Sequence, residues 1–322
     1  MKDERTPKVV VIGGGTGLPV LLRGLKYLPI DITAIVTVAD DGGSSGRLRD
    51  ELAMPAPGDI RNVLAALSDV EPLVEDLFQH RFASGNELTG HSLGNLILAA
   101  MTSITGDFVH AIQEMSKVLN VRGKVLPAAN RSVVLHAEMK DGTVVSGESH
   151  IPQSGKPIKR VFLSPNDIEP LSETIRAIRN ADMVVIGPGS LYTSILPNLL
   201  VPKIGEEVCK AKAKKVYVCN VMTQAGETMN YSASDHVKAL YAHMPCPFID
   251  FVIVNDAEIP EEIQKKYEAE QAQPVLYDAH ALKNLGVTVI HDHIVDYGDG
   301  VIRHDTKKVS SLIFSLLRSP HI

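Results

Sequence analysis

The chain has 322 residues with 44% hydrophobic and 22% charged content, which is the composition of an ordinary globular protein with a substantial core. Its formal net charge is −6 and no segment interleaves a basic stripe with aromatic residues, so we expect no nucleic-acid partner. The longest apolar runs are strand-sized and the charged start leads directly into a strand, so we expect no membrane span, no signal peptide and a cytoplasmic location.

The first predicted element is a buried strand at 8–12 that ends in a glycine-rich turn at 13–17. Leucines then recur on one face of an amphipathic helix, whose first turn contains Pro19. Such a turn lets backbone N–H groups approach an anion, and the helix dipole points its positive end at the same place. The pattern therefore predicts a phosphate cradle, although it matches neither G-x-G-x-x-G nor a Walker A loop. The cradle residues are Gly13, Gly14, Gly15, Thr16 and Gly17.

A second predicted strand, 32–39, ends in the pair Asp40 and Asp41, which precedes a glycine-serine loop at 42–47. This is near the spacing at which an acidic residue binds a ribose hydroxyl in a dinucleotide-binding fold. A single carboxylate is enough for a ribose, so the pair favours Mg²⁺ or a second ligand at the edge of the phosphate.

A helix is predicted after a proline-rich break, with Asp59 as its N-cap and Arg61 and Asn62 in its first turn. Together with Arg47 and Arg49 of the preceding segment, Arg61 could reach the cradle from the other side. Arginines of this kind are more often solvated or paired with nearby carboxylates.

The stretch 90–94 reads G-H-S-L-G and matches the G-x-S-x-G motif of serine hydrolases. That motif requires a strand that runs directly into the serine, and the preceding residues predict no strand. We therefore interpret Ser92 and Asn95 as residues at a helix N-terminus that offer hydrogen bonds to a ligand. Asp107 is the predicted N-cap of the next helix.

The pattern changes at about 125–165, where we predict a β-rich insertion at an edge of the main sheet. Strands are expected at 133–139, 143–146 and 159–163, and the first two form a hairpin whose Asp141-Gly142 turn favours type I′. Around this insertion, strands and helices alternate along the chain. We therefore predict one α/β domain over 1–322, with a Rossmann-like, doubly wound and mostly parallel sheet.

A second glycine turn follows the predicted buried strand at 183–186. Like the first turn, it stands between a buried strand and a helix and could bind a phosphate. Two such turns at strand C-termini predict one elongated ligand lying across the sheet at a topological switch point. A plain loop is the alternative, because Gly-Pro-Gly is common in turns. The residues of this second turn are Gly187, Pro188, Gly189 and Ser190.

Three more strands are predicted at 215–219, 251–254 and 287–290. Asn220 and Asn255 follow the first two of them, at the positions where open α/β sheets bind ligands. Asparagine at a strand end is also a common turn residue.

Histidines and cysteines provide no certain metal site. His291 and His293 flank Asp292 in an extended stretch, without a third ligand at a recognisable spacing, so we expect a structural or surface role. The cysteines lack C-x-x-C spacing and are expected to be unlinked buried thiols. They are Cys209, Cys219 and Cys246.

The last predicted helix begins after Asp305, which is its expected N-cap. Thr306 lies in its first turn, close in sequence to Arg303, Lys307 and Lys308. A phosphate there would meet both the helix dipole and nearby cations, so Thr306 is a candidate phosphorylation site. The alternative is an ordinary threonine at a helix start.

Taken together, these motifs resemble those of the CofD-like superfamily, and within it most closely the YvcK-type gluconeogenesis factors. They are spread nearly end to end along the chain and are more specific together than any single glycine loop. The matching stretches are 13–18, 38–47, 57–62, 90–95, 187–192 and 254–258.

The resemblance implies a Rossmann-like fold with a pocket for a nucleotide diphosphate. The transferase branch of the superfamily moves a phospholactyl group from a guanosine-diphosphate-activated donor to a deazaflavin alcohol, with Mg²⁺. The YvcK-type proteins instead look like cytoplasmic binders of UDP-sugars, such as UDP-N-acetylglucosamine. Their implied role is in cell shape and cell-wall synthesis during growth on gluconeogenic carbon sources.

One departure separates this chain from the transferase branch. Where that branch is expected to carry Asp-x-Asp, this sequence has Asp59-Ile60-Arg61, a charge reversal that disfavours metal-assisted chemistry but suits diphosphate binding. We therefore expect nucleotide-sugar binding without turnover. A Mg²⁺-dependent transferase resembling 2-phospho-L-lactate transferase is the first alternative, and an NAD-binding oxidoreductase with a dinucleotide in the same cleft is the second.

The predicted site has two parts, and the catalytic residues remain unassigned. The sequence also leaves open whether the chain forms a homodimer and which protein partner responds to the bound state. The expected nucleotide-binding residues are Gly13, Gly14, Gly15, Thr16, Gly17, Gly187, Pro188, Gly189, Ser190, Asn220 and Asn255. The expected residues for a second ligand or Mg²⁺ are Asp40, Asp41, Asp59, Arg61, Asn62, Ser92 and Asn95.

Overall fold

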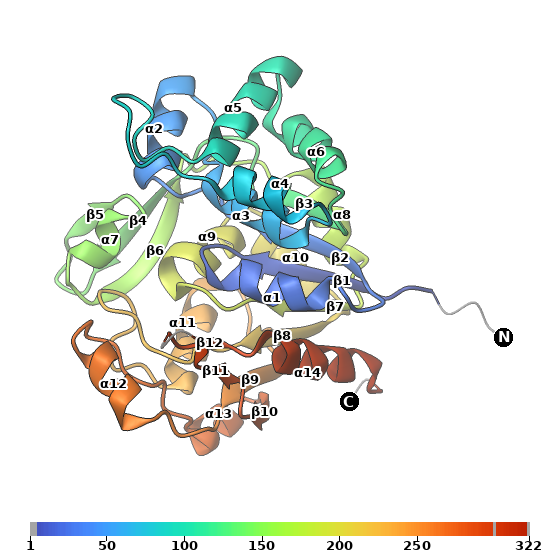
Figure 1. Cartoon of the computed structure of the whole chain (residues 1–322). Coiled ribbons are helices and arrows are strands. Elements are labelled where there is room, and N and C mark those ends of the chain that lie inside the picture. Colours follow the sequence, from blue (N-terminus) through green and yellow to red (C-terminus); the bar gives the residue numbers. More distant parts are fainter. Residues whose placement is uncertain (1–4, 299–300, 321–322) are drawn as a thin grey trace.

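The computed structural model describes residues 5–298 and 301–320. Its centre is a seven-stranded sheet in which every neighbouring pair of strands is parallel (Figure 1). This confirms the predicted α/β fold with a doubly wound, mostly parallel sheet. From edge to edge the strands are β10 (Thr288–Asp292), β9 (Phe251–Asn255), β8 (Lys214–Val218), β7 (Met183–Ile186), β1 (Lys8–Gly13), β2 (Asp31–Val36) and β3 (Lys124–Pro127).

The central strands are continuous apolar runs because helices cover both faces of the sheet. All four residues of β7 are buried, and so are the five residues after Lys8 in β1. Pro127 stands in β3, an edge strand, where a residue without an N–H group is tolerated.

Helices α1, α3 and α14 lie on the face of the sheet toward the viewer in Figure 1, and α8, α9 and α10 lie behind it. Helices α4, α5 and α6 pack around the end near β3. The first seven helices are α1 (Gly17–Leu25), α2 (Gly43–Leu52), α3 (Gly58–Leu67), α4 (Pro72–Gln79), α5 (Leu93–Thr105), α6 (Phe108–Val118) and α7 (His150–Gln153). The later ones are α8 (Ser172–Arg179), the π-helix η1 (Leu191–Ile195), α9 (Leu196–Leu199), α10 (Ile204–Lys210), α11 (Ala233–His243), α12 (Glu261–Glu268), α13 (Ala279–Asn284) and α14 (Thr306–Arg318).

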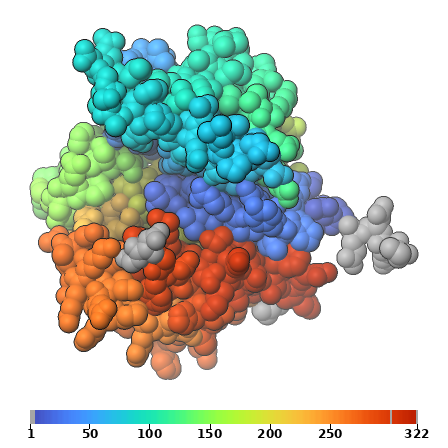
Figure 2. All heavy atoms as spheres, viewed as in Figure 1, coloured from blue at the N-terminus to red at the C-terminus, as the bar shows by residue number. Residues whose placement is uncertain are grey.

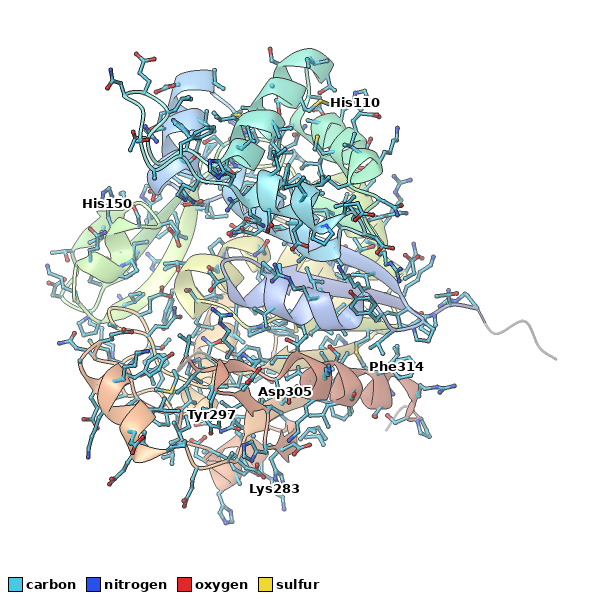
Figure 3. All side chains as sticks on the ribbon, in the orientation of Figure 1. His110, His150, Lys283, Tyr297, Asp305 and Phe314 are labelled. Atoms are coloured by element: carbon cyan, nitrogen blue, oxygen red, sulfur yellow. A yellow bond between two sulfur atoms is a disulfide. The ribbon has the colours of Figure 1, made fainter. Side chains whose placement is uncertain are left out.

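The β-rich insertion is a separate three-stranded antiparallel sheet, made of β4 (Val134–Met139), β5 (Val144–Ser146) and β6 (Ile158–Ser164). It was predicted to lie at an edge of the main sheet, and within the predicted range only β3 does so. The small sheet and α7 instead lie beyond the carboxyl ends of the central strands, where Figure 3 labels His150. This placement brings the insertion next to the glycine loops.

The hairpin turn between β4 and β5 also differs from the type I′ prediction. A type I′ turn needs positive φ at both central residues, and here Gly142 has a φ of 85° while Asp141 is not among the residues with positive φ. The amide N–H of Gly142 donates to the Met139 carbonyl at 3.0 Å, and Thr143 follows. The connection is therefore a type I turn that ends in a left-handed glycine.

Two cysteines predicted to be unlinked form a disulfide. Cys209 and Cys246 are joined with their Cα atoms 6.4 Å apart, whereas Cys219 is a free, buried thiol as expected. The two bonded residues are 37 positions apart, at the end of α10 and in the segment after α11. No short motif indicates such a pair, because the tertiary fold alone brings these segments together.

A short hairpin, β11 (Val295–Asp296) and β12 (Arg303–His304), leads directly into α14, whose N-cap is Asp305 as predicted (Figure 3). In the part of the chain that the structure describes, no single helix has both the length and the apolar composition to cross a bilayer. Helices α5 and α6 pass that test only as a pair, and they are bent by 119° at the break between them.

Candidate functional site

The two glycine loops lie side by side because they follow adjacent parallel strands. The loop at 13–17 follows β1 and the loop at 187–190 follows β7, which pairs with β1. From these two strands the chain order runs outward in opposite directions, through β2 and β3 on one side and β8 to β10 on the other. The loops therefore stand at the carboxyl ends of the strands that form the topological switch point, as predicted.

Close contact between the loops explains several of their glycines. A Cβ atom on Gly17 would lie 2.5 Å from the carbonyl oxygen of Pro188, so only glycine fits there. Gly15 has a φ of 63°, a left-handed conformation that glycine adopts without strain. Asn220 fixes the second loop, since its side chain accepts from the Gly189 N–H at 3.2 Å and donates to the Gly189 carbonyl at 2.8 Å.

Two cavities flank Gly17 and share part of their lining. One, of about 470 Å³, lies between the second glycine loop, the segment at 220–225 and the residues Tyr267 and Glu270. The other, of about 500 Å³, lies between α1, Asn62 and Gln79. Each is large enough for part of a nucleotide. The lining residues common to both are Thr16, Gly17, Ile302, Arg303 and His304.

Asp59 is not the N-cap of α3, and its side chain instead contacts the first glycine loop. The N-cap of α3 is Pro57, and Asp59 stands in the first turn. Its carboxylate accepts a hydrogen bond from the Gly15 N–H at 2.8 Å. A Cβ atom on Gly14 would lie 2.6 Å from the same carboxylate oxygen, so a glycine is needed beside it. One N–H of the predicted phosphate cradle is therefore already bound by an acidic side chain of the protein itself.

Several carboxylates gather around Asp59 and change its protonation. Burial raises the pKa of Asp59 to about 7, and the nearby Asp40 raises it further while the Gly15 N–H and Arg61 oppose the shift. Burial also raises the pKa of Glu148 to about 8, reinforced by the charges of neighbouring carboxylates. Burial raises the pKa of Glu227 as well. Near neutral pH, this acidic cluster therefore retains protons on carboxyl groups that would be ionised in water.

Asp40 and Asp41 hold loops together. Asp40 accepts from the Gly42 N–H at 2.9 Å, and Asp41 accepts from the Ser149 N–H at 2.9 Å, which ties the small sheet to the main one. Among the described residues, no three His, Cys, Asp or Glu side chains are placed to hold a metal ion. The Mg²⁺ site predicted at Asp40 and Asp41 therefore stays a prediction.

The predicted polar residues beyond the aspartates form two separate hydrogen-bonded groups. Ser92 is the N-cap of α5 and accepts from the Asn95 N–H, while the Asn95 side chain donates to Ser44 at 3.1 Å. Arg61 is 7% exposed and donates to the Asn62 side chain at 2.8 Å. Burial lowers the pKa of Arg61, with the charge of Arg81 as the next cause.

The hydrolase interpretation of the stretch 90–94 fails on structural grounds. No strand leads into Ser92, which makes just one isolated bridge with Arg81, and its side chain is fully buried at the start of a helix. Arg47 and Arg49 do not reach the glycine loops either. Arg47 donates to the backbone of Thr89, and Arg49 to the Val133 carbonyl.

Other predicted residues are placed away from the cavities. Asn255 is not among the residues that line them, because its side chain donates to the Ala257 carbonyl and accepts from the Ile294 N–H. Thr306 is the first residue of α14 and packs against Gly24 of α1, at a distance that would exclude a Cβ atom there. His291 pairs with Asp256 on the surface, in keeping with the predicted surface role.

Sequence reasoning missed several residues of the cavities and the acidic cluster. Arg303 lines both cavities, although in sequence it indicated only a cation near Thr306. Gln224 donates to Ser190 of the second loop at 2.8 Å. Glu148 reaches the acidic cluster from the segment between β5 and α7, and no local pattern could have indicated it because the approach depends on tertiary packing.

Known proteins resemble this chain over nearly its full length. A family model described as 2-phospho-L-lactate transferase CofD matches residues 9–295. A Bacillus subtilis protein named gluconeogenesis factor is 73% identical, and the alignment covers 97% of this chain and 98% of the relative. A gluconeogenesis factor of Halalkalibacterium halodurans is 64% identical over 95% of each chain.

A solved structure agrees with these sequence relatives. The crystal structure of a Bacillus halodurans protein is 63% identical, and it superposes with a TM-score of 0.95 over 96% of this chain and 100% of that chain. Identity of this extent, together with the family match, fixes the family as well as the fold. The chain therefore belongs to the CofD family and, within it, to the gluconeogenesis factors.

Proposed function

We propose that this protein binds a UDP-sugar, such as UDP-N-acetylglucosamine, across the two cavities and reports its level without consuming it. The observation that carries the proposal is the pair of cavities on either side of Gly17, which share Arg303. A nucleotide sugar has two bulky ends joined by a diphosphate. The cavities would accept the two ends, and the shared boundary would accept the diphosphate.

Physical chemistry favours an anion at that boundary. Gly17 is the first residue of the nine-residue helix α1, whose unpaired N–H groups and dipole attract negative charge. Arg303 supplies a cation whose planar group can bind two phosphate oxygens at once. Thr16, Ser190 and Asn220 would offer hydrogen bonds to the phosphates and to the polar groups of base and sugar.

Membership of the gluconeogenesis factors supports a proposed biological role. As a gluconeogenesis factor, the protein would link nucleotide-sugar supply to cell shape and cell-wall synthesis during growth on gluconeogenic carbon sources. UDP-sugars are precursors of wall polymers, so a protein that senses one of them suits this role. The ligand would act as a signal, and a protein partner would respond to the bound state.

Binding without turnover requires no catalytic group in the cavities, whereas both enzymatic alternatives require one. Among the described residues that line the two cavities, the histidine is His304. Its ring donates a hydrogen bond to the Cys219 carbonyl at 3.0 Å. Burial lowers the pKa of His304, so its ring is neutral and serves to hold β12 against the end of β8. The NAD-dependent alternative needs a group that handles hydride chemistry, and no pair of residues in the cavities is arranged for one.

A transferase remains the second candidate because of one observation in the acidic cluster. Asp59 and Glu148 have pKa values of about 7 and 8, the range in which a carboxyl group can exchange a proton at neutral pH. An acceptor hydroxyl that reaches these groups could be deprotonated by them. The family description, a 2-phospho-L-lactate transferase, is compatible with such a reaction.

Calorimetric titration of the full chain with UDP-N-acetylglucosamine tests the proposal. Replacement Arg303→Ala should weaken binding at least about tenfold, equivalent to about 1.4 kcal/mol. Lys307→Ala is the matched control, because Lys307 is an exposed cation four positions away that lines neither cavity. Equal affinity in all three proteins would place the ligand elsewhere, and Mg²⁺-dependent consumption of the nucleotide sugar would favour the transferase.

A further inference from the structure

Helix α4 presents an apolar stripe to solvent. Leu73 and Leu77 are 75% and 51% exposed, and Val74 between them is 39% exposed. Residues four apart lie one above the other on a helix, so these side chains form one continuous stripe. Phe78, the one buried residue of the helix, lies beside this stripe, four positions after Val74, and packs into the core. Exposed apolar residues in a contiguous patch indicate an interaction surface more strongly than scattered ones do.

The rim of this stripe is acidic. Glu71 and Asp76 are exposed, and Glu75 shares an ion pair with Arg23 at 3.6 Å. The eight residues of α4 include no lysine or arginine. The stripe therefore offers an apolar centre with negative charge on its borders, a pattern that selects the charge of whatever covers it.

We propose that α4 is the docking surface for a protein partner that presents an amphipathic helix with basic flanks. Apolar side chains of such a helix would cover Leu73, Val74 and Leu77, and its lysines or arginines would meet Glu71 and Asp76. A second copy of this chain would bring two acidic rims together, which costs free energy. An anionic membrane surface would be repelled in the same way.

The position of α4 connects this surface with the nucleotide cavities. Figure 2 shows the atoms around α4 directly above those of α1 on the face toward the viewer. Gln79, the last residue of α4, lines the cavity of about 500 Å³ together with Arg23, the partner of Glu75. A ligand in that cavity would contact both residues. We therefore infer that ligand binding changes the affinity of the docking surface, a coupling that rests on the proposed function.

Fluorescence anisotropy with defined peptides tests the docking surface on the full-length protein. The probe is a labelled amphipathic helical peptide of leucine and lysine, and its control has glutamate in place of every lysine. The leucine-lysine peptide should bind at least about tenfold more tightly. The double variant Leu73→Ser with Leu77→Ser should lose at least about tenfold of that affinity. Leu276→Ser, which alters another leucine that is 68% exposed, should bind like the unmodified protein.

Several outcomes would overturn the docking surface. Equal binding of both peptides, or equal binding by the double variant, would show that the stripe does not recognise a basic helix. Light scattering that reveals a dimer abolished by the double variant would identify a second copy as the occupant. Unchanged melting temperatures of all variants would exclude unfolding as the cause of any loss, as expected for exposed side chains.

The coupling has its own readout. Peptide affinity measured with and without saturating UDP-N-acetylglucosamine should differ at least about threefold, in either direction. Equal affinities under conditions where calorimetry detects bound nucleotide sugar would refute the coupling. Absence of nucleotide-sugar binding in that same calorimetry would refute the proposed function instead, while the peptide comparison would still decide the docking surface.

Discussion

Replacing Asp59 with asparagine should stabilise the protein at alkaline pH. The carboxylate of Asp59 is partly buried against the first glycine loop, and burial raises its pKa from 3.8 to about 7. Asparagine has nearly the same shape, and its side-chain oxygen can still accept the hydrogen bond from Gly15. The substitution therefore removes the buried charge and keeps the contact.

The sign and size of the effect follow from proton linkage. Between pH 4 and 7 the unfolded chain has lost the Asp59 proton while the folded chain keeps it, so the free energy of unfolding falls as pH rises. Three pKa units correspond to about 4 kcal/mol, which is lost in full once the pH has passed 7. The free energy of unfolding of Asp59→Asn should therefore be about 4 kcal/mol higher than that of the unmodified protein at pH 8 and equal to it at pH 4.

Urea unfolding followed by circular dichroism at pH 4, 6 and 8 measures this difference. Asp167→Asn is the control, because the side chain of Asp167 is 78% exposed and its substitution should change stability by less than about 0.5 kcal/mol at each pH. A stability difference for Asp59→Asn that is the same at all three values of pH would refute the reasoning. So would a variant that is less stable than the unmodified protein at pH 8.

Three further predictions concern the cradle, the last helix and its first residue. Gly15→Val places a β-branched side chain at a φ of 63° with its Cβ 3.0 Å from the Ser194 hydroxyl, so calorimetry should show at least about tenfold weaker UDP-N-acetylglucosamine binding. Lys214→Met should cost about 2 kcal/mol in urea unfolding, because the buried ammonium group donates to carbonyls at the end of α14. Thr306 should be found phosphorylated by mass spectrometry of cells grown on gluconeogenic carbon sources, and its absence under every growth condition would retire that proposal.

Local sequence patterns were enough to predict most of the fold. The buried strand at 183–186 was predicted with its observed bounds, since an apolar run with glycines after it has few other solutions. The two glycine loops were predicted to lie at strand C-termini at a topological switch point, and they follow the adjacent strands β1 and β7. Asp107 and Asp305 cap their helices as predicted, through bonds within three residues of each cap.

Features that depend on distant packing could not be predicted in this way. The sequence context of Asp59 predicted an N-cap. In the fold its carboxylate instead accepts a hydrogen bond from Gly15, 44 residues earlier in the chain. Arg303 reaches the cavities from β12, and Glu148 reaches the acidic cluster from the segment between β5 and α7. No periodicity in the sequence reveals where these segments lie. The bond between Cys209 and Cys246 is of the same kind, since it joins segments that are neighbours only in the folded chain.

The central claim, binding of a nucleotide sugar without turnover, is tested most directly by one titration. The full chain is titrated calorimetrically with UDP-N-acetylglucosamine in EDTA, and the recovered ligand is then analysed by mass spectrometry after long incubation with Mg²⁺. We predict saturable binding in EDTA, weakened at least about tenfold by Arg303→Ala, with the ligand recovered intact. Absence of binding, or conversion of the nucleotide sugar in the presence of Mg²⁺, would contradict the claim.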